Sequence, residues 1–296
     1  MLSIMRNKII QKVRKGILLL ANDPKLLFIR FYKKLRIIFP LPKSPVVKKI
    51  TGGGYFRFDF NYDHNVKLMY LGVYEIETVE VMKRIVKNGD VFIDVGANIG
   101  YISAIALGLV GDNGSVHSFE PVPEYYLKLK EVAILNNKSN IFLNQIAVGS
   151  EQGTISIAVT NLSNIGWNTV VPGFMSDNTI KETGPGSSCR LDRYIKEKGL
   201  NGISLIKIDT EGFEFPVLNG LSEYFNNNRD HPAILCEIAP AAYPLLGYKL
   251  EQLEKYMEEY KYKAFDVIGI KKKIELTKLE NTTNVLFIWQ GEELSM

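Results

Sequence analysis

Short apolar runs alternate with segments of helical periodicity along the chain from residue 90 onward. The runs that predict buried strands cover residues 91–95, 115–120, 141–147, 203–209, 233–238, 264–268 and 285–289, and residues 154–160 alternate like an edge or hairpin strand. Helical patterns cover residues 99–110, 123–136, 192–198, 213–221 and 250–260. Strands that alternate with helices are typical of a mostly parallel sheet with helices on both faces. We therefore expect an α/β fold.

The connection between the last two predicted strands differs from the others. Residues 269–284 show no good helical pattern, whereas a parallel connection needs a crossover that is usually a helix. The last strand is therefore predicted to be antiparallel.

The first 50 residues differ in character from the rest. They predict two amphipathic helices, over residues 4–21 and 24–39, each with an apolar and a basic face. Residues 1–50 carry a net charge of +12, and the rest of the chain −8. Neither helix has the roughly 20 apolar residues that a membrane span needs. This arm is expected to pack on the body or on a second subunit, or to lie on anionic lipid. Nucleic-acid binding is the least favoured alternative.

The composition is that of a folded chain. Of the 296 residues, 46% are hydrophobic and 23% are charged, which excludes a disordered or collagen-like protein. Cys189 and Cys236 are too few for a disulfide scaffold and lack the spacing of a zinc site. We expect a cytoplasmic protein, and the basic arm leaves a peripheral position on the inner face of a membrane as an alternative.

A glycine-containing loop follows the first predicted strand of the body. Residues 94–100 read DVGANIG and lead into a helix, whose start offers unpaired N–H groups to a ligand. The spacing from Gly96 to Gly100 differs from the Gly-x-Gly-x-x-Gly that seats a dinucleotide pyrophosphate. Asp94 would repel a pyrophosphate, and it suits a cationic ligand instead.

The second predicted strand of the body ends in an acid, Glu120. An acid at this place is positioned to accept hydrogen bonds from both hydroxyls of a ribose. A ribose site beside an acidic loop favours a nucleoside that carries an amino acid, which is S-adenosylmethionine. The structural alternative is two helix-capping carboxylates in an ordinary α/β protein.

Several segments together resemble the FkbM-type S-adenosylmethionine-dependent methyltransferases. They are residues 72–75 (GVYE), 91–100 (VFIDVGANIG), 119–121 (FEP), 206–214 (IKIDTEGFE) and 233–237 (AILCE). The resemblance spans roughly residues 70–240 and is specific as a combination. It implies a class I methyltransferase (Rossmann-like) sheet of seven strands in the order 3-2-1-4-5-7-6. It also implies methyl transfer to a hydroxyl oxygen, often of a sugar or natural product.

The resemblance also implies which residues bind the cofactor, S-adenosylmethionine. Asp94, Gly96, Asn98 and Gly100 would line its methionine side, Glu120 its ribose, and Gln145 and Ala147 its adenine. Residues 161–187, which predict a long loop and include Trp167 and Asn168, would bind the acceptor.

These expectations divide the chain into three parts. Residues 1–50 form the basic helical arm, and residues 51–89 form a lead-in segment that covers the cofactor pocket with Tyr74 and Glu75. Residues 90–296 form the methyltransferase domain.

An alcohol must lose its proton during methylation, so a general base or a metal is needed. Asp209 and Glu211 end the fourth predicted strand and are the predicted catalytic residues, and Glu237 ends the fifth. Helix capping and an ion pair with Lys207 are the structural alternatives. No histidine stands beside these acids, so we predict no metal.

The sequence thus predicts O-methylation of a hydroxylated glycan or small metabolite. One alternative is a non-catalytic scaffold with a methyltransferase-like fold that the arm recruits to a membrane. Another is an NAD-binding oxidoreductase, which the glycine spacing disfavours. A nucleic-acid methyltransferase is disfavoured as well, because no Asn-Pro-Pro-Tyr-like motif occurs and the body is acidic.

Overall fold

The computed structural model describes residues 41–62, 64–160, 169–174, 180–227, 230–268 and 272–290. The two helices predicted for residues 4–21 and 24–39 lie outside the described residues, as do Trp167 and Asn168. The predictions made for them stay predictions.

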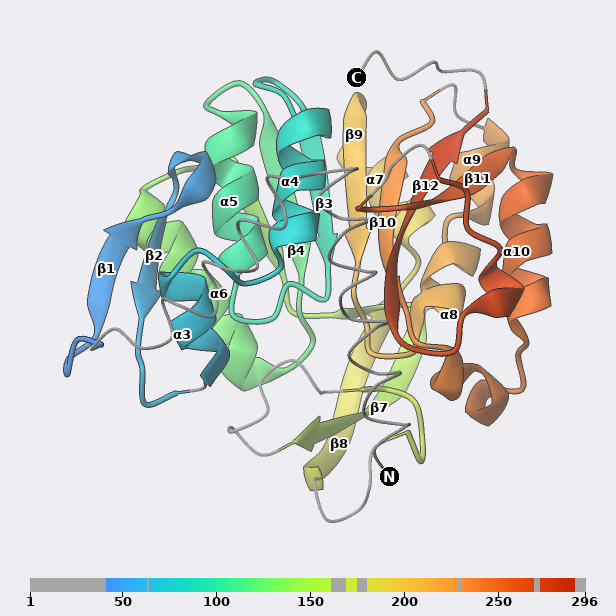
Figure 1. Ribbon diagram of the computed structural model, residues 1–296, viewed down its shortest axis with the longest axis horizontal. Coiled ribbons are helices and arrows are strands. Elements are labelled where there is room, and N and C mark those ends of the chain that lie inside the picture. Colours follow the sequence, from blue (N-terminus) through green and yellow to red (C-terminus); the bar gives the residue numbers. More distant parts are fainter. Residues whose placement is uncertain are drawn as a thin grey trace, which may run out of the picture.

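A seven-stranded sheet forms the centre of the molecule (Figure 1). Its strands are β3 (Val91–Val95), β4 (Ser115–Phe119), β5 (Ile141–Asn144), β9 (Ile203–Ile208), β10 (Ala233–Ile238), β11 (Tyr262–Asp266) and β12 (Thr283–Trp289). They lie in the order β11-β12-β10-β9-β3-β4-β5. Strand β12 is antiparallel to both of its neighbours, β10 and β11. This confirms the predicted order 3-2-1-4-5-7-6 and the antiparallel last strand.

Helices cover both faces of this sheet. They are α3 (His64–Tyr70), α4 (Ile76–Ile85), α5 (Tyr101–Val110), α6 (Pro123–Asn136), α7 (Leu191–Lys198), α8 (Glu214–Asn219), α9 (Ser222–Asn227) and α10 (Leu250–Glu259). Short 3-10 turns occur at η1 (Thr51–Gly53), η4 (Pro240–Leu246) and η5 (Leu276–Lys278).

Alternate strand residues point to opposite faces, and this produces two cores. Phe92 and Leu205 pack with α4, α5 and α6 in one core. Ile93 and Ile206 pack with α7 to α10 in the other. The strands are therefore buried on both sides, which explains why they read as continuous apolar runs.

A smaller sheet lies beside the large one, near the carboxyl ends of its parallel strands. It consists of β6 (Ala147–Val148), β7 (Gly153–Thr160) and β8 (Ile180–Cys189), and β7 pairs antiparallel with β8. The prediction of a loop throughout residues 161–187 is wrong for residues 180–187, which belong to β8. The sequence of this strand, IKETGPGSSC, holds glycines and a proline that disfavour strands, and its pairing with β7 outweighs that preference.

A second small sheet, a hairpin, precedes the domain. Strand β1 (Val46–Lys49) pairs antiparallel with β2 (Tyr55–Phe58). Residues 46–49 belong to the predicted arm but follow its two predicted helices, and in the structure they form β1. Phe56 and Phe58 anchor the hairpin in the core beside α5 and α6.

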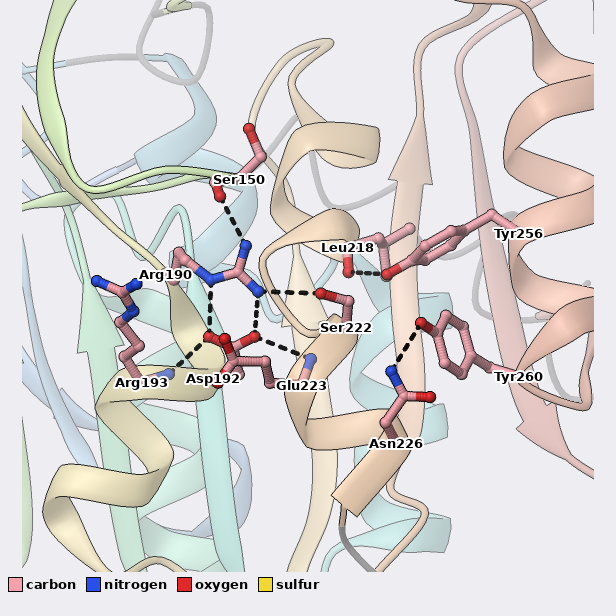
Figure 2. Close-up of polar contacts among 10 residues, drawn as sticks. All are labelled: Ser150, Arg190, Asp192, Arg193, Leu218, Ser222, Glu223, Asn226, Tyr256 and Tyr260. Carbon is pink, nitrogen blue, oxygen red and sulfur yellow. Dashed lines mark hydrogen bonds and ion pairs between the residues drawn. The ribbon is translucent and has the colours of Figure 1, made fainter.

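A buried ion pair fastens the carboxyl end of β8 to the helices that follow (Figure 2). Arg190 forms a two-pronged contact with Asp192, and it also donates to Ser150 O at 2.8 Å and to Ser222 Oγ at 3.0 Å. Asp192 in turn accepts from the Glu223 N–H at 3.1 Å. The network holds the start of α7, the start of α9 and the loop after β6 together. None of the helices in the described ranges is both long and apolar enough to cross a bilayer.

His117 lies within β4 and is shielded from water. Its side chain is 2% exposed, its ring stacks on Phe142, and its Nδ1 lies 2.9 Å from the Tyr194 hydroxyl. Burial, assisted by Lys198, lowers the pKa of His117 from 6.5 to about 4. The burial and the ring contacts of His117 give it a structural role.

We expect His117 to make the fold acid-sensitive. As pH falls from 6.5 to 4, His117 binds a proton in the unfolded chain but stays neutral in the folded chain. The free energy of unfolding should therefore fall across this window, by at most about 3 kcal/mol. His117→Gln should flatten this dependence in urea unfolding curves recorded across the window. His231→Gln is the matched control and should leave it in place. A slope that survives in His117→Gln would contradict the assignment.

Candidate active site

A cavity of about 310 Å³ lies at the carboxyl ends of the central strands. Its wall includes the loop after β3 (Gly96, Asn98), the end of β4 (Glu120), the ends of β9 and β10 (Lys207, Asp209, Glu237) and the start of β6 (Ala147). The carboxyl ends of parallel strands are where open α/β sheets bind ligands. The cavity therefore lies where the sequence predicted the cofactor.

Gly96 brings two loops of the wall into contact. Its φ is +80°, and a Cβ atom there would lie 1.8 Å from the carbonyl oxygen of Asp209. A side chain at this position would collide with backbone, so only glycine fits. The loop after β3 and the acidic loop after β9 are thereby packed directly on each other.

Glu120 forms the wall at the end of β4. Its Oε2 accepts from the Asn98 N–H and its Oε1 from the Val122 N–H, both at 2.8 Å. Burial raises the pKa of Glu120 to about 7. Each carboxylate oxygen accepts up to two hydrogen bonds, so capacity remains for two ribose hydroxyls. Asn98 lines the cavity as expected, with a left-handed φ of 53°.

Three residues predicted to touch the cofactor do not line the cavity. Asp94 is fully buried and accepts from Ser103 Oγ at 2.6 Å, so it supports the loop from beneath. Gly100 stands at the N-cap of α5, where a Cβ would meet the side chains of Leu129 and Val132 on α6. Its role is close helix packing.

The third is Gln145, which the resemblance placed near adenine. It is exposed and does not line the cavity, whereas Ile146 and Ala147 do. Strand β5 already ends at Asn144, so the chain has turned by Gln145 and its side chain leaves the wall. Ala147 lies where it was expected.

The lead-in segment contributes one side of the cavity. Asn65 and Met69 on α3, and Tyr74 and Glu75 before α4, line it. Glu75 has a left-handed φ of 42°, a conformation that costs a non-glycine residue energy and is frequent at functional sites. The sequence had indicated Tyr74 and Glu75. The sequence analysis did not indicate Asn65 and Met69. The only signal that could have pointed to them is the amphipathic pattern of α3.

Three carboxylates meet at the acidic wall. One oxygen from each of Asp209, Glu211 and Glu237 lies within 4.8 Å of the other two. Divalent cations such as Mg²⁺ prefer oxygen ligands, so these three groups could hold one. The absence of a metal, which the sequence predicted, stays a prediction.

Lys207 neutralises part of this negative charge. Its Nζ donates to Asp209 Oδ2 at 2.9 Å, and its side chain is 5% exposed. Burial alone would lower the pKa of Lys207, but Asp209, Glu75 and Asp94 outweigh burial and raise it above its usual value. The ion-pair alternative considered for Asp209 is therefore present. The capping alternative is not present. No side chain caps α8, and the Gly212 N–H donates to Glu214 and not to Asp209 or Glu211.

The other two acids hold their protons near neutral pH. Burial, followed by the charge of Asp209, raises the pKa of Glu211 to about 9. The charge of Asp209, followed by burial, raises the pKa of Glu237 to about 10. Like charges this close disfavour each other's ionisation. The wall thus combines one carboxylate paired with lysine and two neutral acids.

The small sheet reaches this wall through Thr169. The Thr169 hydroxyl donates to the Glu211 carbonyl oxygen at 2.7 Å, and its backbone pairs with Ala158 of β7. Glu211 has a left-handed φ of 50°, and this hydrogen bond helps to hold it there. Sequence reasoning missed Thr169, because it lies in a segment without periodicity.

We expect Glu120→Ala to lower the affinity for S-adenosylhomocysteine at least tenfold. The substitution removes two charge-assisted hydrogen bonds to the ribose, each of roughly 1.5–3 kcal/mol. It also leaves the N–H groups of Asn98 and Val122 without their acceptor. Titration calorimetry measures the change, and a thermal melt checks that the variant is folded.

The pH dependence of the same affinity provides the control. Because the pKa of Glu120 is about 7, its carboxylate gains a proton as pH falls through this value. A neutral acid accepts weaker hydrogen bonds, so wild-type affinity should decline, and Glu120→Ala should lose that decline. A folded variant with unchanged affinity would refute the ribose assignment.

Comparison with known proteins gives the family of the chain. Residues 94–264 match the model of the methyltransferase FkbM domain. Methyltransferase sdnD of Sordaria araneosa is 24% identical over 238 residues, which cover 68% of this chain and 87% of that protein. The 31-O-demethyl-FK506 methyltransferase FkbM of Streptomyces tacrolimicus is 29% identical over 164 residues. That match covers 46% of this chain and 60% of the relative.

Solved structures of similar architecture share little sequence with the chain. A putative rRNA methylase from Clostridium thermocellum is 12% identical with a TM-score of 0.41, over 71% of this chain and 91% of that one. Aeropyrum pernix fibrillarin, solved with S-adenosyl-L-methionine, is 11% identical with a TM-score of 0.40, over 85% of each chain. The family model itself covers more than half of the chain, and the sheet has the strand order that this family implies. The chain belongs to the FkbM family of S-adenosylmethionine-dependent methyltransferases.

Proposed function

We propose that this protein transfers a methyl group from S-adenosylmethionine to a hydroxyl oxygen of a glycan or small metabolite. The observation that carries this proposal is the acidic wall, where Asp209, Glu211 and Glu237 meet beside the glycine loop. One relative supports the choice of oxygen, since it is named as a methyltransferase of 31-O-demethyl-FK506.

The wall of the cavity suits S-adenosylmethionine. Glu120 offers acceptor oxygens for a ribose, and Ile146 and Ala147 offer an apolar surface for a base. The carboxyl oxygens of Asp209, Glu211 and Glu237 present partial negative charge to the cavity, which favours a sulfonium. When bound, this cofactor would supply an electrophilic methyl group.

The residues of this chain would then prepare the acceptor. Asp209 Oδ2 is engaged by Lys207, which leaves Oδ1 to take the proton of the acceptor hydroxyl. Glu211 and Glu237, holding their protons, donate hydrogen bonds to oxygens of the acceptor. Holding the nucleophile in line with the methyl group lowers the barrier by several kcal/mol. The wall therefore favours an acceptor with more than one oxygen near the reacting hydroxyl.

Two measurements test the proposal. Calorimetry should show binding of S-adenosylhomocysteine and none of NAD. Mass spectrometry of glycans and metabolites from cells with and without the protein should then reveal a product heavier by one methylene. Binding of NAD in place of S-adenosylhomocysteine would refute the cofactor. Cofactor binding with no methylated product among any of these molecules would favour the non-catalytic scaffold.

A further inference from the structure

The β1–β2 hairpin presents one face to the core and the other to solvent. Val47 pairs with Arg57, and Lys49 with Tyr55, in the antiparallel register. Residues directly opposite each other in such a pair lie on the same face of the sheet. Val47, Lys49, Tyr55 and Arg57 therefore share the outer face, which we call the hairpin face.

Two apolar or aromatic side chains lie on this face without cover. Val47 is 50% exposed and Tyr55 is 45% exposed. The opposite face of the same strands carries Phe56 and Phe58, which are buried. The exposure of Val47 and Tyr55 is therefore a property of one face, and does not reflect a loosely attached hairpin.

The charge around the hairpin face is strongly positive. Residues 41–58 contain three lysines and one arginine and no acid. Residues 1–40, which join the hairpin at residue 41, carry a further net charge of +9. Two acids lie close to the hairpin: Asp59 follows β2 directly, and Glu131 on α6 lies 3.9 Å from Arg57. The basic character of the arm thus continues onto the folded body.

We propose that the hairpin face lies against an anionic lipid bilayer. Cations beside a valine and a tyrosine match the interface of such a bilayer, where phosphates are negative and tyrosine rings sit at headgroup level. A nucleic acid would use the cations but leave Val47 in water. The proposal is independent of the methyl-transfer chemistry.

The test is vesicle flotation of the full chain. The vesicles contain either phosphatidylcholine alone or equal parts of phosphatidylcholine and phosphatidylglycerol. The protein should float with the anionic vesicles and not with the neutral ones. Added salt should release it, because screening at physiological ionic strength acts beyond about 8 Å.

A double charge reversal tests whether the hairpin face is the part of the protein that contacts the vesicle. Lys49→Glu with Arg57→Glu, both on the hairpin face, should weaken binding to anionic vesicles about 30-fold or more, since each cation at the surface contributes a factor of about five. Lys255→Glu with Lys278→Glu is the matched control and should bind like wild type. Those lysines are 79% and 71% exposed. They lie on or against α10, across the molecule from β1 and β2 (Figure 1).

A double substitution of the two exposed side chains distinguishes insertion into the bilayer from simple charge attraction. Val47→Ser with Tyr55→Ser should weaken binding at least several-fold without changing the net charge. Leu245→Ser removes a comparable exposed side chain, 49% exposed on η4, and should have no effect. Thermal melts of all four variants show whether they are folded.

Three results would overturn the proposal. The first is hairpin variants that float like wild type, because the arm alone would then hold the lipid. The second is equal binding to neutral vesicles, because charge would then play no part. The third is retention of an RNA duplex in a gel shift with no vesicle binding at low salt, because the surface would then serve nucleic acid.

Discussion

Replacement of Asp209 by asparagine should lower the turnover of methyl transfer by about 10²-fold or more while most cofactor binding is retained. The two side chains are nearly the same size, and the asparagine oxygen can still accept from Lys207. What is lost is the carboxylate that we propose takes the proton of the acceptor. Steady-state assays with the acceptor found by mass spectrometry measure turnover, and calorimetry with S-adenosylhomocysteine measures binding.

The same variant has a second expected signature, in its pH profile. The charge of Asp209 is the main reason that the pKa of Glu237 is about 10. Removing that charge should lower the pKa of Glu237, so its ionisation should move to lower pH. Carbon-13 NMR of labelled glutamate carboxyls can follow this shift. Equal losses of cofactor affinity and fold stability, with turnover per bound cofactor unchanged, would instead assign Asp209 a structural role.

Lys207→Met should destabilise the fold strongly, by about 3–5 kcal/mol at neutral pH. The substitution removes the cation that pairs with Asp209 at 2.9 Å inside the wall. Buried carboxylates would then be left without compensation and would have to take up protons on folding. Urea unfolding monitored by circular dichroism measures the change.

The sign of the pH dependence distinguishes this cause from lost packing. Lys207 lowers the pKa values of Glu75, Asp94, Glu211 and Glu237, so without it these folded-state values rise further above their unfolded values. Stability is then retained at low pH and lost as pH rises through the folded values. The deficit of Lys207→Met should therefore grow with pH, and a deficit independent of pH would indicate packing alone. Lys255→Met, at an exposed position, should change stability by less than about 0.5 kcal/mol.

The sequence predicted the large sheet well because its strands are buried on both faces. Strands β3, β9 and β10 are mostly apolar, a pattern that is typical of strands buried on both faces. Asp209 follows β9, and Glu237 lies near the end of the adjacent parallel strand β10, so their meeting could be inferred from strand order. The glycine loop was predicted for the same reason.

Other features depend on contacts that the sequence does not display. Asp94 lies near the carboxyl end of β3, where a ligand-binding acid can stand, but its register opposite Lys207 places it beneath the loop. Gln145 missed the cavity because β5 ends one residue earlier. Strand β8 forms because it pairs with β7, although its glycines and proline disfavour strand structure. Each of these outcomes was decided by tertiary context and not by local preference.

The place of β12 in the sheet has a consequence for biosynthesis. This strand is made after all the others, yet it lies between β10 and β11. While the ribosome is still translating residues 283–289, β10 has one bare edge and β11 has no strand to pair with. Exposed strand edges are templates for aggregation, and nascent domains fold as units. We therefore expect the protein to depend on chaperones during translation, and the sheet around Glu237 to be completed only after residues 283–289 have left the ribosome.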